Sequence, residues 1–167
     1  MENTKIYLAG PDVFIEDSDV GERKKALCKE HGFAPLYPLD NEVSGPDACQ
    51  KIYAANLSMV DEADFVLANV SPFRGPHCDP GTAFEIGYAI AQNKPVITYS
   101  NDERELIQRI REDFSDLIGS GFAIEDFKRH ENLMVANVSE CVCVDERDDL
   151  SAWKAFNRAL AKISEIE

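Results

Sequence analysis

The 167-residue chain is 44% apolar and 29% charged, ordinary values for a soluble globular protein that is large enough to bury a sizeable core. Its 17 Lys and Arg residues against 31 Asp and Glu residues give a net charge of −14, which argues against nucleic acid or an anionic membrane as the main partner. The chain shows no signal-peptide pattern and no apolar run near the roughly 20 residues that span a bilayer. Five cysteines without a C-x-x-C pair are typical of a reducing compartment. We therefore expect a cytoplasmic protein without a structural metal.

Predicted strands and helices alternate along the chain. Short apolar runs predict five strands, at residues 5–9, 33–37, 63–70, 94–99 and 139–144. Apolar residues that recur every three to four positions predict helices over 16–31, from Pro46, from Pro80, over 103–111 and over 148–163. The order predicts an α/β fold: a single domain over 1–167, built as a doubly wound, flavodoxin-like or Rossmann-like, five-stranded parallel sheet flanked by helices.

Two predicted helices carry a recognisable apolar face, and the last strand carries two cysteines. Alternation along a strand places Cys141 and Cys143 on the same face. The residues that recur every three to four positions in the helix after Pro46 are Ile52, Tyr53, Asn56, Met59 and Val60. Those of the last helix are Leu150, Trp153, Phe156, Leu160 and Ile163.

One carboxylate is isolated in an apolar helix. Residues 82–92 read TAFEIGYAIAQ, and Glu85 is the only charged residue among them. Asp79 can cap the helix and Pro80 suits its first position. Helical side chains lean toward the N-terminus, so the Glu85 carboxylate should point at the free amides there and stay ionised. It is then either a nucleophile or acid/base group, or a buried glutamate that its neighbours satisfy for structural reasons.

Other common chemistries find little support. The glycines form neither G-x-G-x-x-G nor a Walker loop, and no nucleophile elbow is present. Three histidines lie far apart and lack metal spacing; of these, His77 is expected to face solvent. In a parallel sheet the ligand binds beyond the carboxyl ends of the strands, where Tyr7, the loop after Val70 and the start of the Glu85 helix should meet.

Four segments resemble the nucleoside 2-deoxyribosyltransferase family. They read IYLAGPDVF at 6–14, PLYPLDN at 35–41, ANVSPFRGPHCDPGTAFEIGYAIAQNKPV at 68–96 and NLM at 132–134. The block D-x-G-T-A-F-E-I-G after FRGP is the most specific part. Members of this family exchange the base of a 2′-deoxyribonucleoside for another base, or hydrolyse the sugar–base bond when no acceptor is present. The resemblance implies nucleosides and free nucleobases as partners and no metal or organic cofactor.

The resemblance also implies roles for single residues. Glu85 matches the nucleophile, which forms a covalent deoxyribosyl-enzyme much as retaining glycosidases do. Asp79 matches a carboxylate that contacts the sugar or assists proton transfer to the base, and Tyr7 matches the tyrosine that orients the nucleophile. Asn132 matches an asparagine that completes the neighbouring subunit's site, which implies a dimer-based homo-oligomer. Further substrate contacts are implied at Asp12, Phe14, Glu42, Asn69, Arg74, Gly81 and Met134.

Three positions depart from the family pattern. Asn69 stands where many members have an aspartate, and an amide cannot act as a general acid, so the identity of the acid stays open. Glu42 replaces a base-contacting glutamine. The chain ends in SEIE without the terminal tyrosine of some members, which leaves open whether Glu167 substitutes for that carboxylate.

Two alternative functions remain beside the transferase. The first is a hydrolase of deoxynucleoside 5′-monophosphates. Such an enzyme has to bind a phosphate dianion, but this chain is acidic and only Arg74 is an evident cation near the site. The second is a non-catalytic nucleoside-sensing module, which has no need of an ionised Glu85 beside Tyr7 and Asp79.

Overall fold

A five-stranded sheet forms the centre of the computed structural model, which describes residues 3–16, 19–40 and 43–166. All paired strands are parallel and their order is β2-β1-β3-β4-β5. This is the flavodoxin-like order, and it confirms the predicted α/β sheet. The strands are β1 (Lys5–Ala9), β2 (Ala34–Leu36), β3 (Phe65–Asn69), β4 (Val96–Ser100) and β5 (Val142–Cys143).

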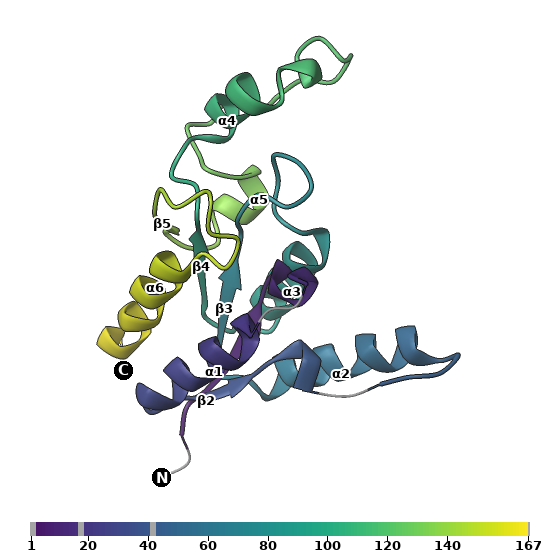
Figure 1. Ribbon diagram of the computed structural model, residues 1–167, viewed down its shortest axis with the longest axis vertical. Helices are drawn as coiled ribbons and strands as arrows, with labels where there is room; N and C mark the ends of the chain where they lie inside the picture. Colours follow the sequence, from purple (N-terminus) through teal and green to yellow (C-terminus); the bar gives the residue numbers. More distant parts are fainter. Residues whose placement is uncertain (1–2, 17–18, 41–42, 167) are drawn as a thin grey trace.

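Helices cover both faces of the sheet (Figure 1). α1 (Val20–Glu30) and α6 (Trp153–Ile166) lie on one face, and α2 (Ala48–Glu62) and α3 (Pro80–Ala91) lie on the other. Two short helices, α4 (Leu106–Asp113) and α5 (Leu133–Ala136), follow β4, and the chain between them extends away from the sheet in Figure 1. Three single-turn 3-10 helices complete the described elements: η1 (Pro11–Phe14), η2 (Pro38–Asp40) and η3 (Ser115–Leu117). In the described ranges, none of the helices has the length and apolar character that crossing a membrane requires.

The central strands read as nearly continuous apolar runs because helices bury both of their faces. On one face, Ile6 and Leu67 pack against Phe156 and Leu160 of α6. Tyr7, Val66, Met59 and Ile86 belong to the core on the opposite face. Consecutive β1 residues therefore point into different cores, and this alternation directs Tyr7 toward α3.

The last helix begins at Trp153, five positions after the expected start at 148. The Asp149 carboxylate accepts hydrogen bonds from the Ser151 and Trp153 amides, at 2.9 and 3.3 Å, and so forms a turn before the helix. Ala152 within this turn has a φ of 51°, which is incompatible with a helix. Leu150 was expected on the apolar face, but it is 65% exposed.

Two other elements also differ from expectation. The helix expected from Pro46 begins at Ala48, and its Ile52 and Tyr53 are exposed while Met59 and Val60 are buried. The core thus covers the apolar face of α2 at Met59 and Val60 but leaves it exposed at Ile52 and Tyr53. The fifth strand, expected over 139–144, comprises two residues, since β5 pairs only with the end of β4.

Candidate active site

The carboxyl ends of β1 and β3 lie side by side, so the loops that follow them meet at one edge of the sheet. Gly10 follows β1, and a Cβ added to it would lie 2.7 Å from Cβ of Asn69, the last residue of β3. This distance is too short for any side chain. Glycine at this position therefore lets the backbone leaving β1 pass against β3.

Asp79 caps the helix that carries Glu85. Its Oδ2 accepts hydrogen bonds from the Thr82 amide at 2.8 Å and the Thr82 hydroxyl at 3.1 Å, and Pro80 occupies the first helical turn, which confirms the predicted helix start. A Cβ on Gly81 would lie 2.9 Å from Asp79 Oδ2, so this glycine leaves room for the carboxylate. The cap also places a second carboxyl group near Glu85.

Tyr7 and Glu85 form the central contact of the site. The buried Tyr7 hydroxyl donates a 2.6 Å hydrogen bond to Glu85 Oε1. Burial raises the pKa of Glu85 to about 7; the Tyr7 hydrogen bond opposes this shift and the Asp79 charge adds to it. Burial and the adjacent Glu85 raise the pKa of Tyr7, which therefore stays a protonated donor. The carboxyl group is thus only partly ionised at neutral pH, whereas the sequence predicted full ionisation at the helix N-terminus.

A buried polar layer lies beneath this edge. The Lys24 ammonium donates to Asp12 Oδ2 at 2.8 Å and to the Tyr99 hydroxyl at 3.0 Å. Asn69 Nδ2 donates to Asp12 Oδ1 at 3.2 Å, while its Oδ1 accepts from the Ser71 hydroxyl at 2.6 Å. Asp12 and Asn69 were both expected to contact substrate. In the structure they are buried, and they hold each other and the loop after β3 in place.

Aromatic side chains line a cavity between the segments that follow β1 and β3. The Phe14 and Phe73 rings are stacked with their centroids 5.2 Å apart, and the Arg74 guanidinium carbon lies 5.3 and 4.6 Å from these centroids. Phe14 and Phe73 line a cavity of about 300 Å³ together with Pro11, Ser71, Pro72 and Leu150. Its walls suit a flat aromatic ring, and the predicted residues Phe14 and Arg74 thus come together here.

The segment after α4 holds the remaining predicted residues. Asn132 Oδ1 accepts from the Met134 amide at 3.0 Å, so Asn132 is the N-cap of α5, and its Nδ2 donates to Glu125 at 2.6 Å. Met134 is 75% exposed. Asn132 lines a second cavity, of about 260 Å³, with His77, Phe122 and Glu125. Glu42 lies outside the described residues.

Glu131 connects this segment to the site loop, a contact that sequence reasoning missed. Its buried carboxylate accepts from the Cys78 and Asn132 amides, both at 2.7 Å, and lies 2.6 Å from His77 Nδ1. The hydrogen bond to Glu131 raises the pKa of His77. Burial alone would raise the pKa of Glu131, but these hydrogen bonds lower it. His77 was expected to face solvent; it is about half exposed and joins two segments that are far apart in the sequence.

Comparisons with known proteins identify the family and the fold. The profile of the family described as nucleoside 2-deoxyribosyltransferase matches residues 6–134. A solved 2-deoxyribosyltransferase from Leishmania mexicana is 32% identical, with a TM-score of 0.78 and a match that covers 97% of each chain. A solved CMP N-glycosidase from Clostridium botulinum is 18% identical, with a TM-score of 0.47, over 90% of this chain and 98% of that one.

A curated relative is an uncharacterized protein of Schizosaccharomyces pombe. It is 32% identical over an alignment of 114 positions, and the match covers 64% of this chain and 54% of the relative. The matched region thus spans about half the length of that relative.

Proposed function

Because this chain belongs to the nucleoside 2-deoxyribosyltransferase family, we propose that it exchanges the nucleobase of 2′-deoxyribonucleosides by a double displacement through Glu85. The observation that carries the proposal is the 2.6 Å hydrogen bond from the Tyr7 hydroxyl to the Glu85 carboxylate, in the helix that Asp79 caps. A carboxylate oriented in this way can attack an electrophilic carbon and later leave it, as in retaining glycosyl transfer.

The proposed reaction has two balanced steps. First, a Glu85 carboxylate oxygen forms a bond to C1′ of the sugar while the C1′–N bond breaks. The electron pair of the broken bond leaves with the base, which takes up a proton. Second, a nitrogen of the acceptor base attacks C1′ and gives up its proton to the group that protonated the departing base, while the ester bond breaks and Glu85 regains its negative charge. Water in place of the acceptor gives hydrolysis as a side reaction.

Asp79 is the proposed partner in proton transfer. Asn69, which stands where many family members have an acid, cannot donate a proton as an acid, and its amide is engaged with Asp12 and Ser71. Asp79 lies close enough to Glu85 for its charge to raise the pKa of Glu85. Its carboxyl group therefore combines the structural role of a helix cap with the proposed chemical one.

The aromatic cavity is the proposed binding place of the nucleobase. The stacked pair of Phe14 and Phe73 offers an apolar surface for a heterocyclic ring, and aromatic rings gain stability from such stacking. The guanidinium of Arg74 lies against the same two rings, so its position is coupled to theirs.

A second copy of the chain is the proposed protein partner. Asn132 lies on the segment that extends from the sheet, and it lines a separate cavity. Aromatic side chains of α2 and α3 supply an apolar surface: the exposed Tyr53 and Phe84 rings are 6.2 Å apart, and the partly buried Tyr88 ring lies 6.4 Å from that of Phe84. In the proposed dimer, the two copies cover this surface and the Asn132 of one copy completes the other's site.

A base-exchange assay tests the proposed function. The protein is incubated with deoxyinosine or thymidine and free adenine, and the formation of deoxyadenosine is measured. A parallel incubation uses inosine, whose 2′-hydroxyl disfavours the oxocarbenium-like transition state, and should give far slower turnover. A third uses deoxynucleoside 5′-monophosphates without an acceptor.

The outcomes separate the alternatives. Deoxyadenosine formation from deoxyinosine or thymidine supports the transferase. Base release from monophosphates without exchange would identify a nucleotide hydrolase instead. Binding of nucleosides without turnover would identify a sensing module, and equal turnover of inosine and deoxyinosine would contradict the proposed sugar specificity.

A further inference from the structure

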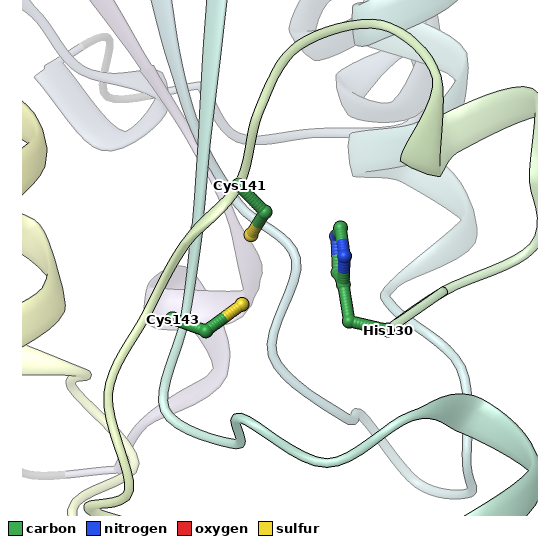
Figure 2. Close-up of side chains that lie close together, drawn as sticks. All are labelled: His130, Cys141 and Cys143. Atoms are coloured by element: carbon green, nitrogen blue, oxygen red, sulfur yellow. The ribbon is translucent and has the colours of Figure 1, made fainter. Parts of the chain in front are cut away.

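A histidine and two cysteines lie together on the β5 side of the sheet. One ligand atom each from His130, Cys141 and Cys143 lies within 4.8 Å of the others, and the three side chains are partly buried. Figure 2 shows both sulfur atoms on the side of their strand that faces the His130 ring. The predicted alternation, which placed the two cysteines on one face, leads to this arrangement.

The His130 ring has an unmet bonding requirement. Its Nε2 is buried and lacks a hydrogen-bond partner among the residues that the structure describes. Buried polar atoms without partners are rare in proteins. An imidazole nitrogen beside two thiols offers the kinds of ligand atom that zinc prefers. From these three side chains we infer a zinc-binding site, with the imidazole and two thiolates as ligands and a water as the fourth.

The distances are compatible with zinc. Tetrahedral ligands at Zn–S and Zn–N distances of about 2.3 and 2.0 Å lie roughly 3.5–3.8 Å from one another. Ligand atoms that lie within 4.8 Å of each other need to move by about 1 Å at most. Partial exposure gives the ion a route from solvent, and the Cys-x-Cys spacing lets one short segment of the chain supply both thiolates.

Arg109 fixes the backbone of the histidine, because its Nη2 donates a hydrogen bond to the His130 carbonyl at 3.1 Å. Asp102 accepts from Arg109 Nε at 3.0 Å and balances the charge of the guanidinium.

The site would fix the end of the segment between α4 and α5, next to Asn132. His130 lies two residues before this N-cap of α5, while Cys143 belongs to β5 and Cys141 lies just before that strand. A bound ion would therefore tie the extended segment to β5. The inference is independent of the proposed transferase, because metal binding is measured without substrate.

Cobalt and zinc titration of the full, reduced chain tests the inference. Under anaerobic conditions Co²⁺ should bind one equivalent and show thiolate-to-cobalt charge transfer with tetrahedral d–d bands, and Zn²⁺ should displace it. Zinc affinity is measured by competition with a chromophoric chelator. The test variants are Cys141→Ser, Cys143→Ser and His130→Ala; the matched controls are the exposed Cys49→Ser and His31→Ala.

Each test variant should bind zinc at least about tenfold more weakly, since losing even an outer-shell partner has that effect. The controls should match wild type. Circular dichroism checks that each variant is folded. If a variant does not fold, the cobalt spectrum of the wild-type protein tests the inference by itself. Absent charge-transfer bands, zinc affinity unchanged in all three variants, or a Cys141–Cys143 disulfide that persists in reductant with excess zinc would overturn the inference.

Discussion

Tyr7 and Glu85 are 78 positions apart in the sequence, yet the Tyr7 hydroxyl donates a 2.6 Å hydrogen bond to the Glu85 carboxylate. The contact joins the central strand β1 to α3. Burial and the Glu85 charge raise the pKa of Tyr7, so the phenol donates throughout the neutral range. It holds the carboxylate through the oxygen Oε1. A strand and a helix, rather than loops, thus fix the orientation of the proposed nucleophile.

Replacement of Glu85 should separate activity from stability. Glu85→Gln and Glu85→Ala should lower base exchange by several orders of magnitude, because both remove the nucleophile. The fold should not be weakened, since burial raises the pKa of Glu85 and its ionised form is therefore unfavourable in the folded state. Exchange rates and thermal denaturation measure the two effects.

The matched control is Glu30→Gln, on the exposed end of α1. It should leave both exchange and stability near wild type. Exchange by either Glu85 variant above about one hundredth of the wild-type rate would remove Glu85 from the mechanism.

The pKa of Glu85 also predicts how stability changes with pH. The folded-state pKa of about 7 is above the ordinary value of 4.5, so the protonated form favours folding. This contribution is present below pH 4.5 and is lost as pH rises through about 7. At pH 8, Glu85→Gln should therefore be more stable than wild type by at most about 3 kcal/mol, less where solvent screens the charge. Equal pH dependence of unfolding in the two proteins would contradict a raised pKa.

The same pKa predicts the acid limb of the activity profile. Attack requires the ionised carboxylate, so kcat/KM for deoxyinosine should rise with pH and level off above about 7. An initial-rate series across this range measures it. A midpoint near the ordinary 4.5 would show that burial does not control the ionisation of Glu85 in the working enzyme.

Tyr7→Phe tests the orienting hydrogen bond. Losing a hydrogen bond to a charged group should lower kcat roughly ten- to hundredfold, equivalent to about 1.5–3 kcal/mol. Because the Tyr7 hydrogen bond lowers the pKa of Glu85, its loss should also move the acid limb to higher pH. Tyr37→Phe, in the core on the other face of the sheet, is the control. A fall in kcat with an unmoved acid limb would assign Tyr7 a merely structural role.

The sequence predicted well those elements that are specified by residues close together in the chain. The strands β1, β3 and β4 are buried on both faces and read as apolar runs. The start of α3 is specified by Asp79 and Pro80, which are adjacent in the sequence. The start of α6 was missed because the Asp149 side chain forms a turn that apolar periodicity does not reveal.

Local patterns could not predict contacts between distant segments. Lys24 pairs with Asp12, and His77 with Glu131 54 positions away, through tertiary geometry alone. The cysteine alternation was predicted correctly, but the approach of His130 to that face follows from the path of the chain after α4. The pKa of Glu85 likewise depends on the surrounding burial, which outweighs the helix terminus and the Tyr7 hydrogen bond.

Mixing inactive variants tests the shared site. Asn132→Ala should lower activity by misplacing the sugar, and it should also weaken the N-cap of α5, by about 1 kcal/mol. Glu85→Ala and Asn132→Ala subunits, dissociated and reassembled together, should recover about a quarter of wild-type activity if random isologous dimers form. No recovery in oligomers that native mass spectrometry shows to be mixed would mean that each chain builds its own site.

The most direct test of the proposed mechanism is whether Glu85 carries the sugar. The protein is incubated with deoxyinosine alone, quenched in acid, digested and analysed by mass spectrometry. The peptide that contains Glu85 should gain one deoxyribosyl group, and the adduct should disappear with formation of deoxyadenosine when adenine is added before the quench. Glu85→Gln should show no adduct. Base exchange with Glu85 unmodified, or an adduct on Asp79 instead, would contradict the account.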